Sequence, residues 1–143
     1  SIPLPAGMDK AMLTVRAPYF FNQRNGILPV DFYLPDTETT TIFYASSDGG
    51  ESWSATTPVK RSVAQHFFDD MHGWSWDGEK LVRTTDGGHT WEDTAGLPSN
   101  DFGPVKIDFI SSEQGWVLMQ TEGDLPGELY VTMDGGRHWQ QAH

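Results

Sequence analysis

Short apolar runs, separated by polar and turn-forming residues, recur along the whole chain. Residues 105–110 alternate apolar with polar side chains, which is the pattern of a strand with one buried face. Residues 116–119 and 129–132 are short runs rich in β-branched and aromatic residues, which favour strands. The 15 Gly and 9 Pro are scattered between such runs and leave little room for a long helix. The pattern therefore predicts an all-β chain.

Only the segment from Val59 to Asp70 is open to a helical interpretation. Val63, Phe67 and Phe68 within it have a spacing that suits one face of a helix. The same segment lines up with the repeats described next, and that alignment favours a strand that ends at Phe67 and Phe68. We predict a strand here.

An internal repeat organises the strands. A hydroxyl residue, an Asp two positions later, a Gly-Gly pair and a Trp five positions after the Asp occur three times. Each copy is preceded by a Phe that is followed six residues later by Gly, and by an apolar residue three positions before the hydroxyl. Three features in one order indicate a repeated supersecondary unit. The positions are Ser46, Asp48, Gly50 and Trp53; Thr84, Asp86, Gly88 and Trp91; Thr132, Asp134, Gly136 and Trp139; Phe20, Phe67 and Phe109 with Gly26, Gly73 and Gly115; and Phe43, Leu81 and Leu129.

Each unit predicts four strands: one ending near the Phe, one after the Gly, one entering Asp-Gly-Gly and one carrying the Trp. A lone four-stranded sheet leaves two faces uncovered, whereas sheets stacked radially in a β-propeller bury both. We therefore predict a single segment, residues 1–143, of about three antiparallel propeller blades. The blades are expected at about residues 11–58, 62–97 and 104–142.

The three Asp side chains admit a structural and a functional interpretation. An Asp carboxylate can accept hydrogen bonds from backbone N–H groups one or two residues on and so pin a tight turn, while Gly supplies the positive φ that the turn needs. The Trp is expected to pack beneath the turn. Asp48, Asp86 and Asp134 could instead be metal ligands or catalytic acids. Their identical placement in successive repeats favours the structural role, because one active site needs no threefold copy.

The pattern Ser/Thr-x-Asp-x-Gly-x-x-Trp resembles the Asp-box, or BNR repeat. With the preceding Gly-Trp it is similar to propellers of photosystem II assembly and stability factors, sortilin-type receptors and xyloglucan-hydrolysing enzymes. The resemblance implies that the box is structural, lies between the third and fourth strands, and belongs to an extracytoplasmic or secreted protein. Those propellers have six to ten blades. We therefore expect a piece of a longer propeller, or a half-ring that dimerises to complete six blades.

Composition and charge exclude several classes of binding partner and of functional site. The net charge of −11 repels phosphate backbones, which disfavours nucleic acid. Aromatic residues make up 13% of the chain, which excludes a wholly disordered acidic tail. No apolar run approaches the length of a membrane span, and no leader opens this sequence, so an export signal is expected outside it. Without Cys there is no thiolate metal site or Cys nucleophile, and the five His lack the i, i+4 spacing of a helical zinc site. We predict no metal and no cofactor.

Enzymatic activity has weak support. The sialidases that resemble this repeat need three arginines, a Tyr–Glu pair and an Arg-Ile-Pro segment, and no Arg-Ile-Pro occurs here. A glycoside hydrolase pair of carboxylates is neither supported nor excluded by the many acidic residues. Trp74 and Trp76 lie on one face of a strand and could form a sugar-stacking platform. Trp74 aligns with Trp116, which predicts that Trp74 lies in the blade core. Phe20 is predicted to lie in the core for the same reason, because it aligns with Phe67 and Phe109. Trp76 is therefore the better candidate for a binding residue.

The order of strands sorts the loops between two rims. The loops between second and third strands and the links between blades fall on one rim, and the boxes fall on the other. Acidic residues gather on the first rim, where they could attract a basic peptide or protein, hold a divalent cation, or simply keep the protein solvated. We predict a non-enzymatic binding or assembly scaffold that presents this rim to a protein or peptide. The alternative is part of a carbohydrate-active propeller that binds or hydrolyses glycans. The candidate rim residues are Asp36, Glu38, Trp76, Asp77, Glu79, Asp101, Glu122, Asp124 and Glu128.

Overall fold

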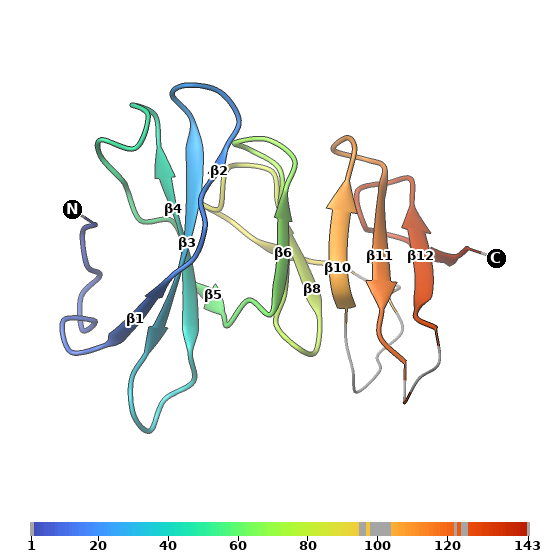
Figure 1. Ribbon diagram of the computed structural model, residues 1–143, viewed down its shortest axis with the longest axis horizontal. Coiled ribbons are helices and arrows are strands. Elements are labelled where there is room, and N and C mark those ends of the chain that lie inside the picture. The colour runs from blue at the N-terminus through green and yellow to red at the C-terminus, as the bar shows by residue number, and fades with distance from the viewer. Residues whose placement is uncertain (1, 95–96, 98–103, 122, 124–125, 143) are drawn as a thin grey trace.

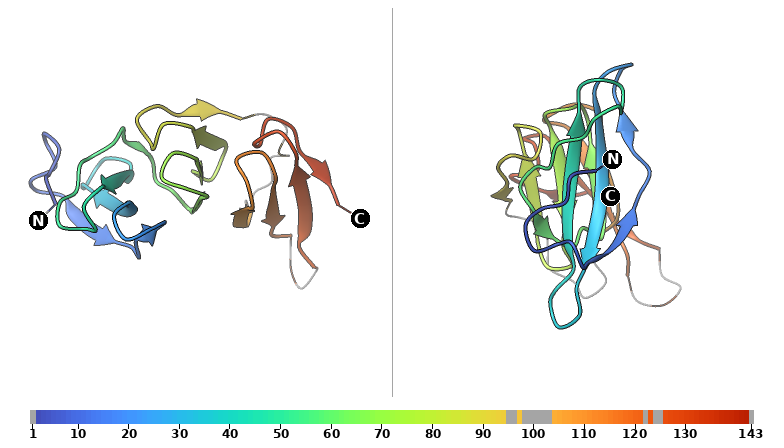
Figure 2. Two further views of the ribbon diagram at one scale, coloured as in Figure 1. Left: turned by 90° about the horizontal axis from the view of Figure 1, so that it is seen from above. Right: turned by 90° about the vertical axis from the view of Figure 1, so that its left-hand side faces the viewer.

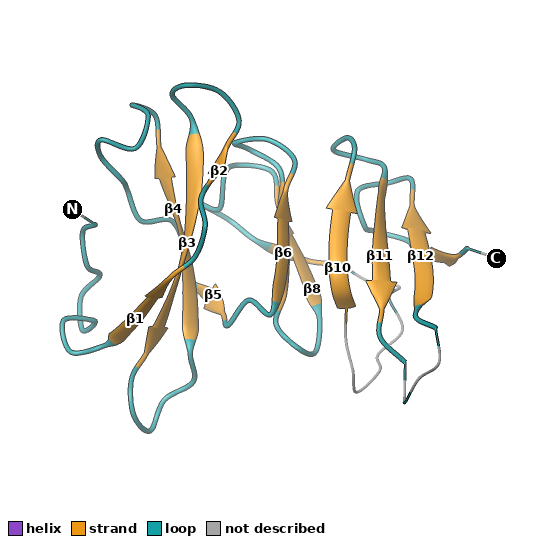
Figure 3. Ribbon diagram, in the orientation of Figure 1, coloured by secondary structure: helices purple, strands orange, loops and turns teal. Residues whose placement is uncertain are grey.

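The computed structural model contains three antiparallel sheets and describes residues 2–94, 97, 104–121, 123 and 126–142 (Figure 1). The described residues form strands and loops (Figure 3). The first sheet comprises β1 (Met12–Val15), β2 (Tyr19–Phe20), β3 (Gly26–Tyr33), β4 (Thr40–Ser46) and β5 (Val59–Lys60). The second comprises β6 (Ala64–Phe67), β7 (Gly73–Trp76), β8 (Leu81–Thr84) and β9 (Glu92–Asp93). The third comprises β10 (Pro104–Phe109), β11 (Gly115–Met119), β12 (Glu128–Thr132) and β13 (Gln140–Gln141).

Each sheet is a meander with four strand positions. The second and third sheets run β6-β7-β8-β9 and β10-β11-β12-β13. In the first sheet β1 and β2 share one position, because β1 pairs with residues 30–33 of β3 and β2 pairs with residues 26–27. The predicted fold class, an all-β set of four-stranded antiparallel sheets, is therefore confirmed.

The segment that was open to a helical interpretation contains β5 and β6, so the strand prediction is correct. The expectation that the fourth strand carries the Trp is wrong: β9 and β13 begin at the residue after Trp91 and Trp139. Among the described residues, no helix is long and apolar enough to cross a membrane.

The three sheets lie side by side in one row, with the two ends of the chain at opposite ends of that row (Figures 1 and 2). The second sheet is therefore covered on both faces. Between it and the first sheet lie Ile27, Phe43 and Phe67, which are 0–3% exposed. Between it and the third sheet lies a larger cluster of Trp74, Trp76, Leu81, Ile107, Phe109, Val117 and Met119, each at most 4% exposed.

The same aromatic corner recurs in all three sheets. The Phe at the end of the first strand position pairs across the ladder with a Gly: Phe20 with Gly26, Phe67 with Gly73, and Phe109 with Gly115. The box Trp of the same sheet meets that Phe ring edge-on, with ring centroids 5.9, 6.2 and 6.1 Å apart. A Cβ added to the Gly would lie 2.8, 2.4 and 2.4 Å from ring atoms of the Phe. The ring therefore occupies the space that any other residue's side chain would need.

Phe20 differs from its two counterparts in burial. It was expected in the core by alignment, but it is 45% exposed, whereas Phe67 and Phe109 are 3% exposed. The ring of Phe67 packs against Phe43 of the first sheet, with ring centroids 5.0 Å apart. The ring of Phe109 stacks in parallel on Trp74 of the second sheet, with ring centroids 3.4 Å apart. In the described part of the chain, no sheet lies on the outer side of the first sheet to cover Phe20 in the same way (Figure 2).

These corners predict unequal penalties for one substitution. Gly73→Ala and Gly115→Ala should each destabilise the fold by about 1–3 kcal/mol, because the added methyl meets a ring that is packed on both sides. Gly26→Ala is the matched control and should cost less than about 1 kcal/mol, since the exposed Phe20 ring has room to shift. Urea unfolding followed by Trp fluorescence measures all three. Equal penalties at the three positions would contradict this account.

Candidate functional site

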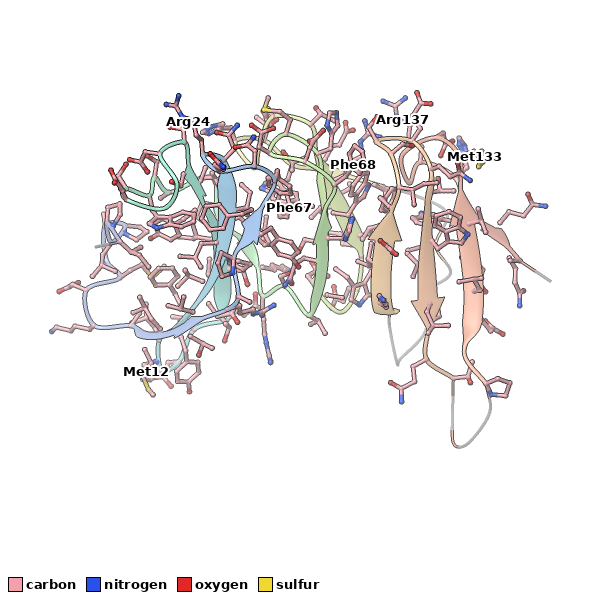
Figure 4. All side chains as sticks on the ribbon, turned by 45° about the horizontal axis from the view of Figure 1, so that its top comes forward. Met12, Arg24, Phe67, Phe68, Met133 and Arg137 are labelled. Atoms are coloured by element: carbon pink, nitrogen blue, oxygen red, sulfur yellow. The ribbon has the colours of Figure 1, made fainter. Side chains whose placement is uncertain are left out.

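Two rims of the row differ in construction. We define the box rim as the box turns, residues 47–53, 85–91 and 133–139, together with loops 21–25, 68–72 and 110–114. The loop rim comprises loops 34–39 and 77–80, the link 60–63, and the described part of the β11–β12 connection. Figure 1 shows them at opposite edges of the row. Figure 4 shows Arg24, Phe68, Met133 and Arg137 along the box rim and Met12 at the opposite edge.

Each box turn is held by a pair of side chains acting together. In the second box the Thr84 hydroxyl donates to Asp86 at 2.8 Å and accepts from the N–H of Gly88 at 2.9 Å. The Asp86 carboxylate accepts from the N–H and the hydroxyl of Thr90 at 2.8 and 2.6 Å. The Asp therefore reaches a backbone N–H four residues on, not the one or two residues expected. The other two boxes repeat this arrangement around Asp48 and Asp134.

The first Gly of each box ties the turn to the neighbouring loop of the same sheet. The N–H groups of Gly49, Gly87 and Gly135 donate to the carbonyls of Arg24, Met71 and Glu113 at 2.8–2.9 Å. All three glycines have positive φ, between 73° and 76°. A Cβ at Gly49 or Gly87 would lie 2.9 Å from a carbonyl oxygen of that loop. Gly is therefore required both for backbone conformation and for close approach.

In the third box a His takes the place of a hydroxyl residue. Ser52 and Thr90 donate their hydroxyls to the box Asp, and at the same position the Nδ1 of His138 lies 2.6 Å from Asp134. The His138 side chain is 89% exposed. The sequence shows the substitution, but the sequence interpretation gave His138 no role, because the part played by the residue four positions after the box Asp is visible only in the structure.

The box carboxylates are strongly stabilised in their charged form. Hydrogen bonds from the hydroxyl and N–H of Ser52 lower the pKa of Asp48 to about 2, and those from Thr90 lower the pKa of Asp86 to about 2. At Asp134 desolvation opposes the shift, but bonds from His138 and Thr132 outweigh it and lower the pKa to about 2. These carboxylates are engaged in the turns and ionised at neutral pH, which suits a structural role and not that of a general acid.

The acidic residues expected on the loop rim separate into three groups. Asp36 and Glu38 lie in the β3–β4 loop and Glu79 in the β7–β8 turn, all with exposed side chains. Asp77 accepts hydrogen bonds from the N–H groups of Glu79 and Lys80 and so shapes its turn, while Glu128 accepts one from the Tyr130 hydroxyl. The candidates Asp101, Glu122 and Asp124 lie outside the described residues. Within the described part of the chain, Asp36, Glu38, Asp77, Glu79 and Glu128 form no ion pair.

The loop rim also contains cations that the sequence interpretation missed. A hollow of about 370 Å³ lies between the first two sheets, and its lining joins Glu38, Asp77 and Glu79 to Lys60 and Arg61. Three carboxylates therefore share this hollow with two cations. The rule that places links between sheets on this rim would have located Lys60 and Arg61.

Trp76 does not belong to the loop rim surface, so its prediction as a binding residue is wrong. Its side chain is 2% exposed and packs in the cluster between the second and third sheets. Trp74, predicted to be core, is 1% exposed. Because both rings are covered by the third sheet, they form no sugar-stacking platform in this structure.

A polar network joins the first two sheets. The guanidinium of Arg16 donates to the carboxylate of Asp31 at 2.6 and 3.0 Å and to the backbone carbonyl of Ser62 at 2.7 Å. It also donates to the side-chain oxygen of Gln65 at 2.8 Å. The hydroxyl of Thr41 donates to Asp31 and accepts from the N–H of Ser62, which is itself fully buried. This network fixes the link 60–63 and hence the position of Lys60 and Arg61.

Of the described histidines, His66, His72 and His138 each contact a single carboxylate. His72 contacts Asp69 at 2.9 Å, and His66 lies 3.8 Å from Asp108. Over the residues that the structure describes, no three His, Asp or Glu side chains converge closely enough to hold a metal ion.

Side-by-side meander sheets with Asp-box corners define a β-propeller of the BNR type. Residues 41–143 match the Sortilin-Vps10 family (sortilin, neurotensin receptor 3). This chain therefore belongs to the Sortilin-Vps10 family, as its resemblance to sortilin-type propellers predicted.

Curated relatives and solved structures agree with this class. The chain is 27% identical over 109 residues to the vacuolar protein sorting/targeting protein 10 of Chaetomium globosum and 36% identical over 76 residues to the photosystem II assembly lipoprotein Ycf48 of a Synechococcus strain. These matches cover 68% and 51% of the chain, but only 7% and 21% of the relatives' own lengths.

Two solved structures share the fold. A structure described as YCF48 bound to D1 peptide matches 99% of this chain with a TM-score of 0.65 and 23% identity, over 46% of its own length. YCF48 from Cyanidioschyzon merolae matches 98% of the chain with a TM-score of 0.56 and 19% identity, over 38% of its own length. The three sheets therefore correspond to part of a propeller.

The box chemistry predicts a specific pH dependence. A carboxylate whose pKa is lowered by folding stabilises the fold above its ordinary value of 3.8 and loses that contribution as the pH falls towards 2. Asp86→Asn should cost about 1 kcal/mol at pH 7, because the amide replaces an acceptor of charged hydrogen bonds. Between pH 4 and pH 2 its free energy of unfolding should fall less than that of the unmodified chain.

Chemical denaturation at pH 7, 4, 3 and 2 tests this prediction. Asp9→Asn, at an exposed position outside the boxes, is the control and should leave both the stability and its pH dependence unchanged. An acid-induced loss of stability that is identical in Asp86→Asn and the unmodified chain would show that the box carboxylate does not contribute to it.

Proposed function

We propose that this chain is a non-enzymatic binding or assembly module whose loop rim receives a basic segment of a protein or peptide. The carrying observation is that the loop rim gathers five described carboxylates that no cation of the described chain pairs with. Three of them line the hollow between the first two sheets, where Lys60 and Arg61 offset them only in part. A partner's Lys or Arg side chains would supply the missing charge.

Two further observations support a binding role over catalysis. The box carboxylates are engaged in turns, and Trp74 and Trp76 are buried, so neither these carboxylates nor these two rings are available to a carbohydrate-active site. A solved propeller of similar fold is described as bound to a peptide, and the description of the matching family names a receptor, and both support a peptide-binding role for this chain. We also propose an extracytoplasmic location, supported by the description of one relative as a lipoprotein.

The test compares charge reversals on the two rims. Glu38→Lys/Glu79→Lys alters the loop rim, and Glu51→Lys/Glu113→Lys makes the same change at exposed positions on the box rim. Each pair moves the net charge from −11 to −7. Fluorescence anisotropy would follow a labelled 12-residue peptide of alternating Lys and Ser, with a Glu-Ser peptide as the acidic counterpart.

We expect the unmodified chain to bind the Lys peptide and not the Glu peptide, and to lose affinity as salt is raised. The loop-rim pair should weaken binding roughly tenfold or more, and the box-rim pair by less than about threefold. If both variants lost the same amount of affinity for the Lys peptide, the binding would depend on net charge and not on the loop rim. Absence of binding to the Lys peptide would refute the proposed rim.

A further inference from the structure

Charges of both signs line the hollow between the first two sheets, and they do not pair with one another. The carboxylates of Glu38, Asp77 and Glu79 share this hollow of the loop rim with the cations of Lys60 and Arg61. Within the part of the chain that the structure describes, no ion pair joins any of these five side chains to another residue. Both the carboxylates and the cations are therefore open to a ligand.

A neighbouring cation on the same rim shows the contrast. Lys80 lies at the end of the β7–β8 turn, and its ammonium group lies 3.2 Å from the carboxylate of Asp93. Lys80 is therefore already neutralised by a side chain of its own sheet. Lys60 and Arg61 have no such partner among the described residues, although three carboxylates line the same hollow. These two cations are the ones that a partner can reach and pair with.

Backbone hydrogen bonds fix the segments that carry these charges. Lys60 is the last residue of β5, and the N–H of Arg61 donates to the carbonyl of Thr39 at 3.0 Å, which joins the link to the end of the β3–β4 loop. In the β7–β8 turn, the carboxylate of Asp77 accepts from the N–H of Glu79 at 2.9 Å. The backbone positions of the charged residues are thus set before a partner binds, which lowers the entropy cost of binding.

Resting on the function proposed above, we infer that the segment bound at this hollow carries an acidic residue next to its basic residues. A Lys or Arg of the partner would lie against Glu38 and Glu79, and an Asp or Glu of the partner would lie against Lys60 and Arg61. The planar guanidinium of Arg61 can donate two parallel hydrogen bonds to one carboxylate. A purely basic segment would instead meet two like charges, which weakens its binding. Lys60 and Arg61 therefore determine which basic segments the loop rim accepts.

Two peptides test this inference. The first is the 12-residue Lys-Ser peptide, and in the second, the mixed peptide, the two Ser residues nearest the centre are replaced by Glu. Because the chain has a net charge of −11, general electrostatic attraction favours the more basic Lys-Ser peptide. We expect the opposite order: in fluorescence anisotropy at one salt concentration, the mixed peptide should bind about threefold more tightly.

Matched variants assign this preference to the two cations. Lys60→Gln/Arg61→Gln removes the cations of the hollow, and Lys10→Gln/Arg24→Gln removes two exposed cations outside the loop rim, so each pair moves the net charge from −11 to −13. The loop-rim pair should bind the Lys-Ser peptide more tightly and lose the preference for the mixed peptide. The control pair should keep that preference. Thermal melting of each variant establishes that it is folded.

The outcomes separate this inference from the function on which it rests. If the Lys-Ser peptide binds at the loop rim and the mixed peptide binds no more tightly, the inference is overturned and the proposed function stands. A preference for the mixed peptide that survives in Lys60→Gln/Arg61→Gln does not come from these cations, and it overturns the inference as well. If neither peptide binds, the proposed function and the inference fail together.

Discussion

The contact of a Phe ring with a Gly backbone sets the form of each sheet. Because the Phe67 and Phe109 rings fill the space where a Cβ of Gly73 or Gly115 would lie, the first two strands can approach only if the second begins with Gly. The box Trp packs edge-on against the same Phe ring. This contact holds the turn between the third and fourth strands at the same corner of the sheet. The hydroxyl–Asp pair, the two glycines of the box and the neighbouring loop all hold that turn in place. The rest of each sheet extends from this corner.

This use of the Asp carboxylates distinguishes the two rims of the row. Asp48, Asp86 and Asp134 accept backbone and side-chain hydrogen bonds inside their turns, so the box rim has little uncommitted acidity at those positions. The opposite rim has carboxylates without ion pairs around a hollow that spans two sheets. One rim thus stabilises the sheets, and the other presents charge. The Arg16–Asp31 network connects these roles, since it fixes the link that carries Lys60 and Arg61.

The row of sheets also explains why equivalent residues differ in exposure. Leu81 is 2% exposed and Leu129 is 39% exposed, although both stand three positions before a box hydroxyl. The difference lies in the neighbouring sheet and not in the strand. A middle sheet is covered on both faces, and an end sheet is covered only where another segment packs on it. Among the described residues, Leu118 and Leu129 on the outer face of the third sheet are therefore more exposed than the residues between the sheets.

The sequence by itself determined the repeat, the strand order, the box corners and the division of loops between two rims. All of these depend on local spacing: the six residues from Phe to Gly and the five from Asp to Trp are fixed by turns and ladder pairing within one sheet. Only the tertiary structure decided that Trp76 is buried, that Phe20 is exposed, and that Lys60 and Arg61 join the acidic hollow. Alternation along a strand tells which side chains share a face, but whether that face meets another sheet, a loop or water depends on residues far away in the chain.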